Sequence, residues 1–124
     1  MALYEDIITF CKRELNIPQD VLVSIEQIDL SEDNVHGWTT DSAEDDAYDI
    51  EIDTGLGFKE AILTVCHEMV HVKQFLRKEL SSNGMRWKGL PNPNTKSPTT
   101  EPHEVEAYKL EKVLYQKCVD LKLI

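Results

Sequence analysis

The chain opens with apolar residues three and four positions apart, which is the period of a helix with one buried face. Pro18 ends this pattern, because proline rarely continues a helix. We therefore expect an amphipathic packing helix over residues 3–15. Its apolar positions are Leu3, Ile7, Ile8, Phe10, Cys11 and Leu15.

The next apolar stretches favour strands. Residues 21–28 begin with a continuous apolar run, then alternate, and are rich in β-branched side chains. A second short strand is predicted at 35–40, around Trp38 and two threonines. Over 48–53, apolar and acidic residues alternate strictly, as in a strand with one buried and one wet face.

A long helical pattern runs from 58 to 79, and its middle turns are apolar on nearly every side. This is typical of a helix buried through the centre of a domain. Residues 81–100 are rich in Ser, Asn, Gly, Pro and Thr, and only 85–89 are expected to be ordered within them. A connection of this length is either functional or partly mobile.

Helical periodicity returns at Glu101 and continues to the C-terminus. Thr100 is a suitable N-cap, and Pro102 lies in the first turn, where proline is tolerated. The expected core stripe of this helix is Ala107, Leu110, Leu114 and Leu121. The pattern predicts one α+β domain over 1–124, with a small mixed sheet packed against a central helix and helices at both ends.

Composition narrows the class of protein. The 124 residues have a formal net charge of -10, with 41% hydrophobic and 29% charged residues, as in a soluble globular domain. Direct nucleic-acid binding is not expected, because it needs clustered Lys and Arg. No stretch approaches the roughly 20 apolar residues that span a bilayer, so no membrane association is expected.

The cysteines and the N-terminal segment indicate the cellular compartment of the protein. Cys11, Cys66 and Cys118 lie far apart and form no CxxC pair, so free thiols fit best. Glu5 and Asp6 interrupt the first apolar residues, unlike a secretory signal. We therefore expect a cytoplasmic protein in reducing surroundings.

The pattern with the clearest chemistry is His67-Glu68-Met69-Val70-His71. Residues four apart lie one above the other on a helix, so both imidazoles can bind one zinc ion at about 2.0 to 2.1 Å. Glu68 lies beside that position, where it can accept a proton from a zinc-bound water whose pKa falls from 15.7 to about 7. Two core histidines at an accidental spacing are the alternative, and the apolar helix around them favours the metal site.

A catalytic zinc usually has three protein ligands and one open position. The start of the last helix offers several candidates for the third ligand. His103 falls near the core stripe of that helix, and Glu104 and Glu106 flank it on either side. Spacing alone leaves the choice among these three residues open.

The order of these segments resembles the SprT-like and minimal gluzincin metallopeptidases. The resemblance covers 48–108 and consists of an Ile-Glu-Ile-Asp strand, the HEMVH helix, a Trp-Lys-Gly segment and a Pro-x-Glu-x-Glu-Ala helix start. It implies a zincin-like fold with one zinc ion per chain. It also implies that Glu104 is the third ligand beside His67 and His71, and that Ala107 leaves room for the two helices to approach.

One position departs from the family pattern. Gluzincins often have an acidic residue four positions after the ligand Glu, where it orients a ligand histidine, and this chain has Tyr108 there. The resemblance also places Trp87 on an edge strand beside the cleft, of the kind that holds extended peptides, although core packing explains Trp87 equally well. His103, Tyr108 or Arg86 could stabilise the oxyanion.

The sequence thus predicts a zinc metallopeptidase that hydrolyses a protein or peptide substrate. Glu68 is expected to act as the general base and then to protonate the leaving amine. The alternative is a zinc-binding adaptor or inhibitor that uses the same scaffold to bind a protein partner through its acidic surface. The presence of Glu68 argues against the adaptor, since a structural zinc site needs no general base.

Overall fold

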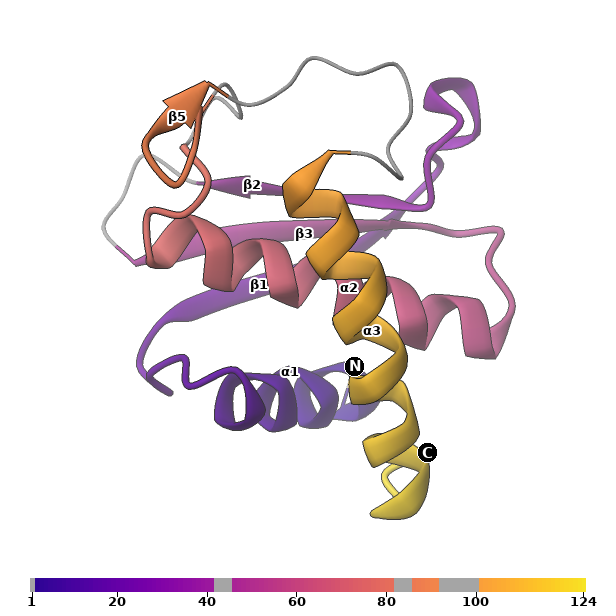
Figure 1. The fold of residues 1–124 in the computed structure, drawn as a ribbon. Helices are drawn as coiled ribbons and strands as arrows, with labels where there is room; N and C mark the ends of the chain where they lie inside the picture. Colours follow the sequence, from indigo (N-terminus) through magenta and orange to yellow (C-terminus); the bar gives the residue numbers. More distant parts are fainter. Residues whose placement is uncertain (1, 42–45, 82–85, 92–100) are drawn as a thin grey trace.

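The computed structural model describes residues 2–41, 46–81, 86–91 and 101–124. Within these ranges, three helices, a three-stranded mixed sheet and a two-stranded hairpin form an α+β fold (Figure 1), which confirms the predicted fold class. The elements are α1 (Ala2–Glu14), β1 (Leu22–Ile28), the 3-10 helix η1 (Ser31–Asp33), β2 (Gly37–Asp41), β3 (Ala47–Asp53), α2 (Phe58–Leu76), β4 (Arg86–Trp87), β5 (Leu90–Pro91) and α3 (Pro102–Asp120).

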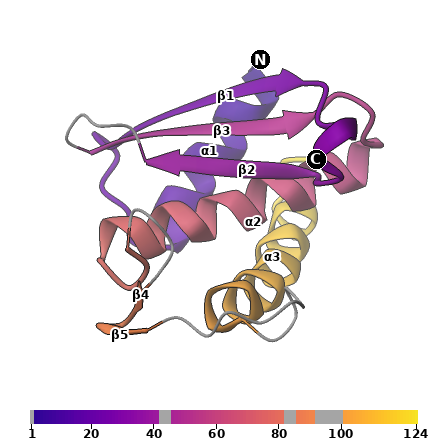
Figure 2. The ribbon, with the colours of Figure 1, turned by 90° about the horizontal axis from the view of Figure 1, so that it is seen from above.

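The three-stranded sheet has the order β1-β3-β2, so β3 is its central strand (Figure 2). β3 pairs with β1 in parallel and with β2 in antiparallel orientation. The alternation predicted for β3 is confirmed, since Tyr48, Ile50 and Ile52 are buried in the core. The face of the sheet that carries these three side chains therefore packs against the helices.

α2 is the central helix of the fold, and it contacts α1, α3, β2 and β3. Every residue from 64 to 74 is buried, which confirms the prediction of a helix surrounded by protein. Complete burial of a side chain such as Ile62 or Met69 contributes about 1.5 to 3 kcal/mol to stability. The polar residues in the middle of α2 therefore lie in a mostly apolar surrounding.

Two predictions at helix ends were wrong. α2 ends at Leu76 rather than at 79, because the amides of Glu79 and Leu80 both fold back to donate to the carbonyl of Gln74. Leu121 was expected in the core but is 60% exposed, because α3 ends at Asp120. Cys118, one turn earlier, takes the buried position.

Some of the remaining sequence predictions concern described residues, and others concern residues that the structure does not describe. Cys11, Cys66 and Cys118 are buried free thiols, as expected. The proposed N-cap Thr100 and most of 81–100 lie outside the described residues, and Glu101 is at the N-cap position of α3. Among the described helices, none combines the length and apolar character needed to cross a membrane.

Candidate metal centre and groove

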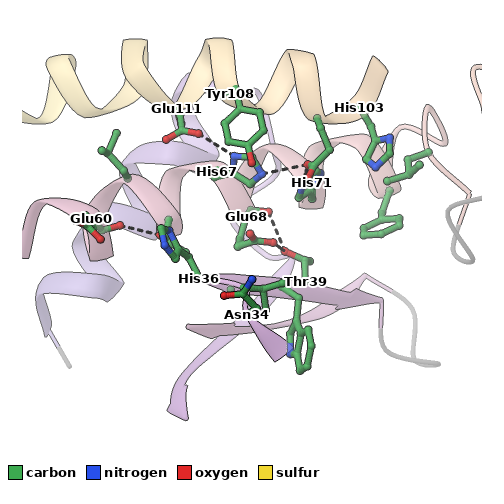
Figure 3. Close-up of a pocket in the computed structure, with 18 residues that line it drawn as sticks. Asn34, His36, Thr39, Glu60, His67, Glu68, His71, His103, Tyr108 and Glu111 are labelled. Carbon is green, nitrogen blue, oxygen red and sulfur yellow. Dashed lines mark hydrogen bonds and ion pairs between the residues drawn. The ribbon is translucent and has the colours of Figure 1, made fainter. Parts of the chain in front are cut away.

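His67 and His71 lie one turn apart on α2, facing α3 (Figure 3). Nε2 of His71 is 2.7 Å from Oε1 of Glu104 on α3, and Nε2 of His67 is 3.1 Å from the same oxygen. One ligand atom from each of the three residues lies within 4.8 Å of the other two. Two imidazole nitrogens and a carboxylate oxygen form a donor set that suits a divalent metal ion such as zinc.

The electrostatics of these three side chains favour a cation between them. Burial lowers the pKa of His67, but hydrogen bonds to Glu104 and Glu111 outweigh it and raise the pKa to about 10. Burial also lowers the pKa of His71, but the hydrogen bond to Glu104 and the charges of Glu68 and Glu104 outweigh it, so the pKa is raised. Burial opposes ionisation of Glu104, yet its bonds to the two histidines hold its pKa well below the usual range. A metal ion would supply this positive charge and release the protons.

Two further side chains orient the imidazoles. The Nδ1–H of His67 donates to Oε1 of Glu111 at 2.9 Å, and the Nδ1–H of His71 donates to Oε1 of Gln74 at 2.8 Å. Both contacts leave the Nε2 atoms directed towards Glu104. Partners of this kind set the tautomer and ring position of metal-binding histidines.

The carboxylate that contacts the far side of the His67 ring comes from Glu111, three residues after Tyr108. Glu104, Tyr108 and Glu111 share one face of α3, because they are spaced by four and three residues. The Tyr108 ring packs 4.7 Å from the His67 ring, while Glu111 reaches the imidazole nitrogen. Sequence reasoning missed Glu111, although its spacing of seven residues from Glu104 was an available signal.

The other candidates for the third ligand have different partners. Oε1 of Glu106 is 2.8 Å from Nζ of Lys73 and accepts a hydrogen bond from Nε2 of Gln74 at 3.0 Å. The His103 ring is centred 5.8 Å from the His71 ring, and its Nε2 is 3.4 Å from Glu101. Of the three alternatives, only Glu104 joins the two histidines.

Glu68 lies beside this group without belonging to it. Its side chain is directed towards β2, where the hydroxyl of Thr39 donates to Oε1 at 2.8 Å (Figure 3). Burial raises the pKa of Glu68, against the opposing effect of the nearby His71. A carboxyl group with a raised pKa is better matched to proton transfer near neutral pH. Sequence reasoning missed Thr39, because it predicted only a short strand in this segment.

A groove of about 740 Å³ runs over these residues. α2 forms its floor, residues 34–39 form one side and α3 forms the other (Figure 3). β2 is an edge strand, and no described strand pairs with its outer side. Gly37 permits the close approach of β2 to α2, since a Cβ there would lie 2.8 Å from both the Glu51 carbonyl and the Thr64 methyl group.

The edge strand beside the groove is β2; Trp87 lies on the short strand β4, outside the lining residues, with its ring centred 6.4 Å from the ring of His103. β4 pairs with β5 in a hairpin that is separate from the three-stranded sheet. Trp87 also forms a bridge to Leu80. Arg86 reaches back to the Gly89 carbonyl and is not among the residues that line the groove. Of the three suggested oxyanion donors, His103 and Tyr108 do line it.

Replacing Glu111 with Gln should weaken zinc binding by about 10- to 100-fold, because the imidazole of His67 loses its charged partner. Competition with a chelator of known affinity measures this change. Asp120→Asn removes an exposed carboxylate from the same helix and should leave zinc affinity unchanged. Equal affinities for all three proteins would show that Glu111 does not support the metal site.

Comparison of the chain with models of protein families, with curated proteins and with solved structures finds no match in any of the three. The likeness to SprT-like and minimal gluzincin peptidases is therefore carried by the sequence segments named above.

Proposed function

We propose that this protein is a zinc metallopeptidase. The observation that carries the proposal is the meeting of His67, His71 and Glu104 at one point, with Glu68 beside them in the same groove. The zincin-like character and the identity of the metal are part of this proposal. A zinc ion held there would lower the pKa of a water from 15.7 to about 7 and polarise a substrate carbonyl.

The residues around the metal position have separate roles in the proposed reaction. Glu68 accepts the proton of the attacking water and later returns it to the leaving amine, while Thr39 holds the carboxylate in place. Glu111 and Gln74 keep the ligand imidazoles in one tautomer. Tyr108 keeps its proton, because burial raises its pKa, so its hydroxyl can donate to the developing oxyanion; His103, which also lines the groove, is the second candidate donor.

The groove supports a peptide as substrate. The lining residues of α2 extend from Glu60 to Phe75, which is about 22 Å along a helix. This length accepts about six or seven residues of an extended chain. The outer edge of β2 offers backbone groups for pairing with such a peptide. We further propose that the enzyme acts in the cytoplasm, since its three buried thiols are free.

Incubation of the zinc-loaded protein with unfolded proteins and a peptide library, followed by mass spectrometry, tests this function. We expect new internal termini that are absent after metal chelation and return when zinc is restored. A fully zinc-loaded protein that cleaves nothing, yet binds a protein partner equally well with Gln in place of Glu68, would favour the adaptor.

A further inference from the structure

The groove has one carboxylate that the proposed chemistry does not use. Four glutamates line it, and the described lining residues include no lysine or arginine. Glu68, Glu104 and Glu111 have the partners described above. Glu60 is exposed, and its hydrogen bond in the groove is made by its backbone carbonyl, which accepts from the Thr64 hydroxyl at 2.7 Å (Figure 3), so that among the described residues its carboxylate has no hydrogen-bond or ion-pair partner. It is therefore free to meet a ligand.

Glu60 shares the face of α2 that carries the two histidines, seven residues before His67 and eleven before His71. The helical rise places it about 10 Å from His67 along the axis. An extended peptide advances about 3.3 Å per residue, so this separation corresponds to about three peptide residues. On the other side of the groove, His36 lies next to Glu60 (Figure 3).

The opposite end of the groove has a different character. It is lined by the apolar side chains of Phe75 and Leu80, next to His103. A bound peptide would thus meet an acidic end at Glu60 and an apolar end at Phe75. Clefts lined by one sign of charge attract the opposite sign, which favours a basic residue at the Glu60 end.

β2 determines which half of the peptide lies at that end. Gly37 packs against Thr64, and Thr39 bonds to Glu68, so β2 and α2 run in the same direction. A peptide paired antiparallel with β2 runs the opposite way, which brings its C-terminal half to Glu60. Antiparallel pairing is both the commoner arrangement and slightly the more stable.

We infer that the groove selects extended peptides with Lys or Arg about three residues after the cleaved bond, where Glu60 contacts the basic side chain. This inference rests on the proposed function, because the metal group defines where the bond is cleaved. Glu60 is exposed, so its ion pair should raise kcat/KM by about two- to fivefold over a neutral residue at that position.

Cleavage of a peptide library randomised around the scissile bond tests the inference. Wild type should enrich Lys and Arg at about the third position after the cut, and Glu60→Gln should lose this enrichment. Glu60→Lys should instead enrich Asp and Glu there. Glu5→Lys makes the same charge change in the first turn of α1 and should leave the wild-type preference intact.

A parallel measurement separates this inference from the proposed function. Binding of uncleaved peptides to Glu68→Gln should show the same basic preference and the same loss on adding Glu60→Gln. If peptides are cleaved without a preference for Lys or Arg, or with a preference that does not change in Glu60→Gln, the inference is overturned and the proposed peptidase function is not. Enrichment before the cut overturns the antiparallel placement. If basic peptides bind through Glu60 but are not cleaved, the proposed peptidase function is overturned and the inference stands. If peptides are neither bound nor cleaved, both are overturned.

Discussion

Glu68→Gln should lower the rate of peptide hydrolysis by about 10² to 10⁴-fold while the protein keeps its fold and its zinc. The amide has the shape of the carboxylate and can still accept the hydrogen bond from Thr39, but it cannot take a proton from water. Turnover of a fluorogenic peptide, zinc content and circular dichroism should be measured on the same preparation.

The matched control for this substitution is Glu26→Gln, which neutralises an exposed glutamate on β1, away from the groove. It should hydrolyse peptides at the wild-type rate. If Glu68→Gln loses zinc as well as activity, Glu68 supports the metal site rather than proton transfer. If it keeps full activity, another residue is the base.

Glu104→Gln should lose zinc, whereas Glu106→Gln should keep about one zinc per chain. Glu104 is the carboxylate that joins the two histidines, and its amide substitute carries no negative charge to offset a cation. Gln at 106 still offers an oxygen to Lys73 and Gln74, so that contact survives in part. The loss of affinity in the Glu104 variant should be large, since a three-ligand site is reduced to two.

Elemental analysis of the two variants, purified side by side, measures this difference, and unfolding curves show whether each protein is folded. His71→Ala should lose both zinc and hydrolysis, which calibrates the effect of removing one ligand. Zinc retained by Glu104→Gln but lost by Glu106→Gln would move the third ligand by two residues along α3.

Hydrophobic periodicity alone was sufficient to predict the main elements of the fold. The strict alternation at Tyr48, Ile50 and Ile52 identified β3, and the apolar turns around His67 identified the buried central helix. Both signals are local, because burial of one face leaves a period in the sequence. The helix ends were less well predicted, since they depend on single capping contacts such as those of the Gln74 carbonyl.

From the sequence, only the residues of the site that lie on a single helix could be predicted with their spacing. His67, Glu68 and His71 share a turn of α2, so their spacing was informative. Thr39 reaches Glu68 from β2, and Glu111 reaches His67 from α3, at separations of 29 and 44 residues. No local pattern indicates such contacts, because they arise when elements pack in three dimensions.

Zinc content of the wild-type protein, purified without added metal, tests the central claim most directly, because every assigned role depends on the metal. Elemental analysis should find about one zinc ion per chain, held by His67, His71 and Glu104. A stoichiometry near zero, with no uptake when zinc is added to the folded protein, would contradict the account.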